Sequence, residues 1–174
     1  MASKKQYILL DADVVIHFYK GGRLIDLKNI FSKNEKIILD IVNQELSKKH
    51  SFKQIASNLI AFGIAKEVSI NDNLKIYQEF ARLKKTFGEG ESACMAYCRY
   101  NDDILASSNL RDIKIYCEKH SIEYYTTMDF LYEAFQKGIF TEAECDEFIY
   151  NVKSQNSKLP VDTISEYIER FIEN

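Results

Sequence analysis

The feature of this 174-residue chain that most restricts its fold is a repeated change of hydrophobic period. Between residue 7 and about residue 137, short apolar runs alternate with stretches whose apolar residues recur at helical spacing. Such alternation predicts parallel strands joined by helices, because a parallel pair needs a crossover connection and the sheet needs cover on both faces. We therefore expect an α/β fold of three layers, with a mostly parallel central sheet of about five strands.

The same patterns place the elements along the chain. A continuous apolar run typical of a buried strand opens the segment 7–18, and further strands are expected at 36–42, 66–70, 103–106 and 123–126. Helical spacing predicts helices at about 24–31, 43–49, 51–62, 71–87, 91–100, 110–120 and 128–137. The sequence Gly88-Glu89-Gly90 is expected to break the chain between two of these helices.

After Gly138 the pattern becomes purely helical. Thr141 and Glu144 form a capping box that predicts a helix to about residue 152, and residues 154–160 have the character of a linker. A last helix begins near Thr163 and carries an apolar stripe that either packs on its own domain or binds a partner chain or a second copy. We expect a domain at 1–140 and a helical extension at 141–174.

Composition excludes several classes of protein. No run of 18 apolar residues is present, and the Lys4-Lys5 pair is followed at once by a strand-like segment with two aspartates, so we expect no membrane segment and a cytoplasmic location. The four cysteines contain no CxxC pair and are expected to be reduced, mostly buried thiols. Residues 1–87 hold 15 basic and 9 acidic side chains, whereas residues 88–174 hold 8 and 17, an asymmetry that would allow one side to bind a polyanion.

Acidic residues recur where the predicted strands end. Asp11 and Asp13 follow the first strand, Glu45 follows the second, and Glu91 opens a helix after the glycine turn. Carboxyl ends of parallel strands meet at one edge of the sheet, where active sites lie in folds of this class. A single acid at such a place is usually a first-turn helix charge. A cluster is costly without cations, and Mg²⁺ or Mn²⁺ is the natural match for oxygen ligands.

Four segments in the same order resemble the motifs of PIN domains, a family of metal-dependent ribonucleases. They are LLDADVVI at 9–16, IVNQEL at 41–46, GEGESACMAYC at 88–98 and the closing module at 103–140. The resemblance implies hydrolysis of RNA phosphodiesters with one or two divalent ions. It implies Asp11, Glu45 and Glu91 as ligands and catalytic residues, with Asp13 as a supporting group and Ser107 and Ser108 as candidates to orient water or a phosphate.

The fourth acidic position departs from the family pattern. Where PIN domains usually carry an aspartate, this chain has Ser107-Ser108-Asn109, with Asp112 three residues further on. Asn109 could still offer its carbonyl oxygen to a metal but brings no charge, and Asp112 either replaces it as a ligand or is an ordinary first-turn acid. The departure leaves full, single-metal or reduced activity open.

Among the basic side chains, Arg23, Lys49 and Arg111 are the candidates for phosphate contacts. His17 has the wrong neighbours for a metal ligand and is expected in the core or at its rim. Small members of the PIN family are often toxins that pair with an antitoxin protein, so the partners implied are RNA, an antitoxin and a second copy.

Two other interpretations compete with the ribonuclease. Asp11-Ala12-Asp13-Val14 also matches the opening motif of haloacid-dehalogenase-like phosphohydrolases, in which the first aspartate is a nucleophile. That family needs a Ser or Thr after the second strand, where this chain has Ile41-Val42. The other alternative is a PIN-like fold that binds RNA or protein without cleaving it, with Asn109 as the sign of lost chemistry.

Overall fold

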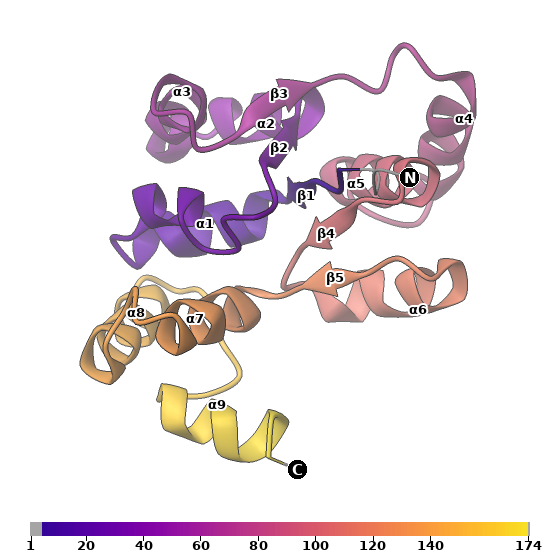
Figure 1. The fold of residues 1–174 in the computed structure, drawn as a ribbon. Coiled ribbons are helices and arrows are strands. Elements are labelled where there is room, and N and C mark those ends of the chain that lie inside the picture. The colour runs from indigo at the N-terminus through magenta and orange to yellow at the C-terminus, as the bar shows by residue number, and fades with distance from the viewer. Residues whose placement is uncertain (1–4, 174) are drawn as a thin grey trace.

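A computed structural model describes residues 5–173, and within that range the central sheet has five strands (Figure 1). The strands are β1 (Ile8–Leu10), β2 (Lys36–Leu39), β3 (Lys66–Val68), β4 (Ile104–Ala106) and β5 (Tyr124–Tyr125). They lie in the order β3-β2-β1-β4-β5, and every neighbouring pair is parallel. The predicted α/β class and five-stranded sheet are confirmed.

Helices cover both faces of this sheet. The α-helices are α1 (Ala12–Lys20), α2 (Asp40–Lys48), α3 (Lys53–Ala61), α4 (Leu74–Leu83), α5 (Glu89–Asn101), α6 (Leu110–His120), α7 (Thr127–Gln136), α8 (Glu142–Ser154) and α9 (Ile164–Phe171), with 3-10 turns η1 (Leu24–Lys28) and η2 (His50–Phe52). In Figure 1, α1, α3, α7 and α8 lie on one side of the strands and α4, α5 and α6 on the other. The result is a three-layer α/β/α arrangement.

Several strands are shorter than the apolar runs that predicted them. The first strand ends at Leu10, directly before Asp11 as predicted, and the apolar residues beyond it belong to α1, which Asp11 caps by accepting from the Ala12 N–H at 2.8 Å. The strand expected at 36–42 ends at Leu39, and α2 begins at Asp40. In both places the apolar run continues into the buried face of a helix, which periodicity cannot separate from a buried strand.

The glycine turn also differs from its prediction. Gly88 is the N-cap of α5, and the helix already begins at Glu89, so Gly90 lies inside its first turn. Residues 71–87 yield the shorter helix α4, which starts at Leu74 because the Asn73 side chain accepts from the N–H groups of Lys75 and Ile76. The break between the two helices therefore spans residues 84–88.

The C-terminal helices pack on the body of the protein. Phe148 of α8 is buried against Phe18 of α1, with ring centroids 5.0 Å apart. A Cβ on Gly21 would lie 2.2 Å from the Phe148 ring, so α8 occupies the space that only a glycine leaves open. In α9, Ile164 and Tyr167 are buried whereas Phe171 is 51% exposed. The apolar stripe of α9 thus packs on the protein through part of its length only.

All four cysteines are buried and unpaired, as expected from their spacing. Burial raises the pKa of the Cys94 and Cys98 thiols well above the ordinary value. Across residues 5–173, none of the helices combines the length and apolar character needed to cross a membrane.

Candidate functional site: a carboxylate cavity at the switch point of the sheet

The chain reverses its direction across the sheet between β1 and β4. Successive crossovers run outward from β1 to β2 and β3, and the chain then returns to β4 beside β1 and continues to β5. The loops after β1 and β4 therefore diverge at adjacent carboxyl ends, a position where α/β proteins bind ligands. The Asp11 N–H donates to the Ala106 carbonyl at 2.9 Å, which holds these two strand ends together.

A cavity of about 310 Å³ lies at this point. Four elements supply its acidic wall: the end of β1 with the start of α1, the middle of α2, and the start of α5. Its lining residues include Asp11, Asp13, Glu45, Glu89, Glu91, Lys49 and Asn109. The sequence predicted most of this convergence, and the structure brings Asp11, Glu45, Glu91 and Asn109 to one cavity.

Gly90 allows two of these carboxylates to approach the α5 backbone. A Cβ at this position would lie 2.8 Å from Glu45 Oε2 and 3.8 Å from Asp11 Oδ1. Both oxygens therefore point at the same small volume, which a side chain would fill. The role of Gly90 is one that the sequence did not reveal beyond a turn signal.

The electrostatics of the cavity favour a positive ligand. Asp11 is 4% exposed, and its pKa is raised well above the usual range by burial and then by the negative charges of Asp13 and Glu91. Burial likewise raises the pKa of Asp13 to about 6 and that of Glu91 above its usual value. A cation bound among these groups would stabilise their ionised forms.

Asp13 is held by the loop after β4. Its Oδ2 accepts from the Ser108 N–H at 2.7 Å and from the Ser107 hydroxyl at 3.4 Å. Both serines therefore position the carboxylate of Asp13 as structural partners. Ser108 also joins the N-terminus of α7, because its Oγ donates to Thr127 Oγ1 at 2.8 Å.

Thr127 was not among the predicted residues. It is fully buried and contacts Nδ1 of His17 at 2.8 Å, so a polar chain runs from Asp13 through Ser108 and Thr127 to His17. His17 lies in the core, as expected, and burial lowers its pKa to about 4. The Thr-Thr pair after the fifth predicted strand was the available signal, since a helix cap is expected there.

Asn109 behaves differently from the expectation that its carbonyl would face a metal. Its side-chain amide donates hydrogen bonds to Glu91 Oε1 and, at 2.9 Å, to Asp112 Oδ2. The amide nitrogen thereby separates two carboxylates that would otherwise repel each other. Asp112 is bound to this amide and does not line the cavity.

The three predicted phosphate contacts have different surroundings. Lys49 lines the carboxylate cavity. Arg111 is exposed on the first turn of α6. Arg23 is directed elsewhere: its guanidinium pairs with Glu144 Oε1 at 2.8 Å and lies 4.8 Å from the centre of the Phe140 ring. It does not line the cavity, because the C-terminal extension engages it.

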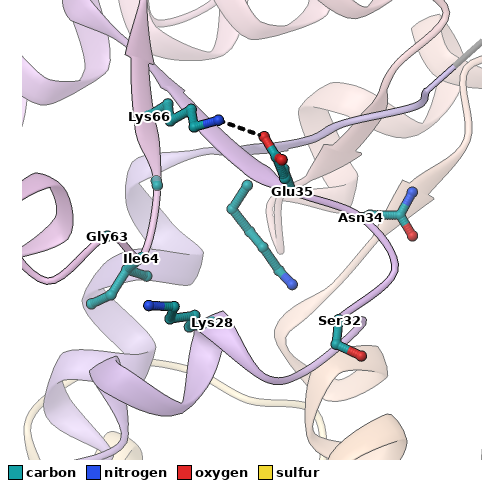
Figure 2. Close-up of a pocket in the computed structure, with 9 residues that line it drawn as sticks. Lys28, Ser32, Asn34, Glu35, Gly63, Ile64 and Lys66 are labelled. Carbon is teal, nitrogen blue, oxygen red and sulfur yellow. Dashed lines mark hydrogen bonds and ion pairs between the residues drawn. The ribbon is translucent and has the colours of Figure 1, made fainter.

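A second cavity of similar size lies at the opposite, amino edge of β2 and β3 (Figure 2). Lys28, Lys36 and Lys66 line it, and Lys66 pairs with Glu35 at 2.8 Å. Lys36 is 4% exposed and donates to the carbonyls of Ile30 and Phe31, while burial lowers its pKa to about 8. Its amine is thus committed to the chain itself, and the two sheet edges differ sharply in charge.

The donor set of the carboxylate cavity suits a hard divalent cation. Its oxygen ligands, the missing Cβ at Gly90 and the raised carboxyl pKa values all agree with that chemistry. In the part of the chain from residue 5 to residue 173, no three His, Cys, Asp or Glu side chains have the spacing of a complete metal site. The carboxylates face one another across the cavity without forming a closed ligand set.

Comparisons with known proteins add no assignment. A scan of family models and a search of curated proteins both found no match.

Proposed function

We propose that this protein is a divalent-metal-dependent ribonuclease of PIN type, with its active site in the carboxylate cavity. The observation that carries the proposal is the convergence of Asp11, Glu45 and Glu91 on one cavity at the switch point of an all-parallel sheet. The order of motifs that resembles a PIN domain supports the same function. The carboxylate oxygens also suit the divalent ions on which metal-dependent phosphodiesterases rely.

Asp11, Glu45 and Glu91 would hold Mg²⁺ or Mn²⁺. When bound, such an ion supplies an activated water and stabilises the leaving oxygen of a phosphodiester. Asp13 would keep the local charge negative, and its hydrogen bonds to Ser107 and Ser108 keep it in place.

Other groups would act on the RNA backbone. Lys49 lines the cavity and is placed to contact a phosphate without reading a base. Asn109 fixes Glu91 by donating to it, which defines where that carboxylate points before any ligand arrives. Asn109 is a positioning residue in this proposal.

The test is cleavage of a structured RNA pool by the purified protein in Mn²⁺ and in Mg²⁺. We expect EDTA to abolish cleavage. We expect Asp11→Asn to reduce the cleavage rate by about 100-fold or more, because metal binding and activation of the attacking water both depend on that carboxylate. Glu35→Gln is the matched control, because it removes one negative charge at the opposite edge of the sheet. Cleavage that survives EDTA or Asp11→Asn would overturn the proposal.

Two alternatives give different results in the same experiment. A non-catalytic RNA-binding module would bind the RNA pool without cutting it in any metal condition. This alternative is tied to Asn109, whose amide already donates hydrogen bonds to two carboxylates. A haloacid-dehalogenase-like enzyme would form a phosphoaspartate on Asp11, detectable by mass spectrometry after incubation with a small phosphate ester.

A role as a toxin follows the PIN resemblance and is proposed on that ground alone. Growth arrest on expression in a bacterial host, absent with Asp11→Asn, would support it. An antitoxin partner and a homodimer stay predictions.

A further inference from the structure

A third cavity, of about 300 Å³, lies between the body of the protein and the C-terminal segment 158–171. Residues from the β4–α6 loop, β5 and the start of α7 form one wall, and Lys158, Leu159, Tyr167 and Phe171 form the other. Figure 1 shows α9, which supplies Tyr167 and Phe171, set apart from the sheet beyond α7 and α8. The volume falls at the lower end of the range for small-ligand sites.

Two aromatic rings of α9 line the cavity, and one of them is held in place whereas the other is half exposed. Tyr167 is 7% exposed, and its hydroxyl donates to Asp129 Oδ1 at 2.8 Å, which fixes the ring. The Phe171 ring lies 5.3 Å from it at an interplanar angle of 31°, yet Phe171 remains half exposed. Tyr124 adds a third ring to the lining. Such a wall suits a flat, conjugated ligand that can stack.

This aromatic cavity and the carboxylate cavity share a wall. Ser108 lines the aromatic cavity, and its neighbour Asn109 lines the carboxylate cavity. The Ser108 N–H also donates to Asp13 at 2.7 Å, so the shared loop is fixed to the acidic side. One extended ligand could therefore place a flat group in the first cavity and an adjoining phosphate beside the second.

Unpaired positive charge lies at the aromatic cavity. Lys158 lines it and has no ion-pair partner within residues 5–173. Arg111 is exposed beside Leu110, another lining residue, and it too has no such partner in the described chain. These cations complement a ligand whose flat groups are linked by phosphates.

From these observations we propose that the aromatic cavity is a nucleobase subsite for single-stranded RNA. It would bind the base of a nucleotide next to the phosphodiester held at the carboxylate cavity, with the exposed Phe171 ring stacking on the base, Tyr167 supporting that ring and Lys158 contacting the phosphate. The inference rests on the proposed function and names the substrate as single-stranded. It also gives the C-terminal extension a part in substrate binding.

The test measures binding of a fluorescein-labelled, mixed-sequence single-stranded RNA by anisotropy in EDTA, where no cleavage occurs. We expect Phe171→Ala to weaken binding about 5- to 100-fold, the loss typical of one base–aromatic stack. Tyr150→Ala is the matched control, because Tyr150 is 70% exposed on α8 and does not line the cavity. RNA with abasic positions offers no base to stack on Phe171. Its affinity for the wild-type protein should therefore be no higher than the affinity of intact RNA for the Phe171→Ala variant.

Equal affinities of wild type, Phe171→Ala and Tyr150→Ala would overturn the subsite. So would a dimer in sedimentation that Phe171→Ala dissociates without changing RNA affinity, since the occupant would then be a second copy. The two proposals fail separately. If RNA binding requires Phe171 but no cleavage occurs, the base subsite stands and the ribonuclease proposal fails. If cleavage occurs and Phe171→Ala does not change it, the ribonuclease proposal stands and the base subsite fails.

Discussion

The substitution Asp13→Asn should remove a loss of stability that the metal-free protein undergoes as the pH rises from about 4 to about 6. Burial raises the pKa of Asp13 from 3.8 to about 6 in the folded protein, so the folded state holds this proton more tightly than the unfolded state does. The free energy of unfolding therefore falls as the pH rises from about 4 to about 6, and the whole penalty is present above that window. A shift of this size corresponds to an upper bound of about 3 kcal/mol.

Asparagine removes the charge and keeps one oxygen to accept from the Ser108 N–H, but its amide nitrogen replaces the oxygen that accepts from the Val14 N–H at 2.6 Å. The lost hydrogen bond costs the variant a similar free energy at every pH. We therefore expect urea denaturation in EDTA to show the stability of Asp13→Asn relative to wild type to be about 1–2 kcal/mol more favourable at pH 7.5 than at pH 4. In saturating Mn²⁺ the difference at pH 7.5 should shrink, because a bound cation removes the penalty on the wild-type carboxylate.

Asp72→Asn is the control, since Asp72 is exposed in the loop after β3. It should change the free energy of unfolding little at either pH. If Asp13→Asn instead destabilises the protein by the same amount at pH 4 and pH 7.5, the carboxylate acts mainly as a hydrogen-bond acceptor and the electrostatic reasoning fails.

Three further substitutions test other parts of the structure. Gly90→Ala should abolish Mn²⁺ binding measured by calorimetry because its Cβ would meet Glu45 Oε2 at 2.8 Å, whereas Gly88→Ala, whose nearest side-chain contact is an ordinary 3.6 Å, should retain it. Phe148→Ala should lower the free energy of unfolding by about 3–5 kcal/mol in one cooperative transition, and a separate early transition would show that the extension folds independently. Ser92→Ala should leave stability unchanged or raise it by up to about 1 kcal/mol in thermal unfolding, because the buried Ser92 Oγ has no hydrogen-bond partner among residues 5–173; a loss above about 1 kcal/mol would contradict this.

The sequence predicted the class and order of elements because the change between apolar runs and helical spacing is a local signal. It predicted α6 at 110–120 to the residue, since both ends are marked by polar turns. The end of the second strand was wrong, because the apolar run at 36–42 enters the buried helix α2 at Asp40. Local sequence patterns do not show whether an apolar run is buried as a strand of the sheet or as the inner face of a helix that covers the sheet.

The candidate site was predictable in part for the same reason. Asp11 caps α1 directly after β1 and Glu91 lies in the first turn of α5, and the sequence marks both boundaries, whereas Glu45 reaches the cavity from the middle of α2. The pairing of Arg23 with Glu144 was not predictable, because it depends on how α8 packs on α1. The amide of Asn109 likewise takes its orientation from two carboxylates that only the folded chain places beside it.

The contact between Phe148 and the region of Phe18 and Gly21 has a consequence for synthesis of the protein. Helix α1 completes its apolar packing only with a helix that is synthesised more than a hundred residues later. Nascent chains that stop before α8 would expose the Phe18 face and be open to chaperones and proteases. The apolar face of α1 would therefore stay open until α8 has been synthesised and has packed against it.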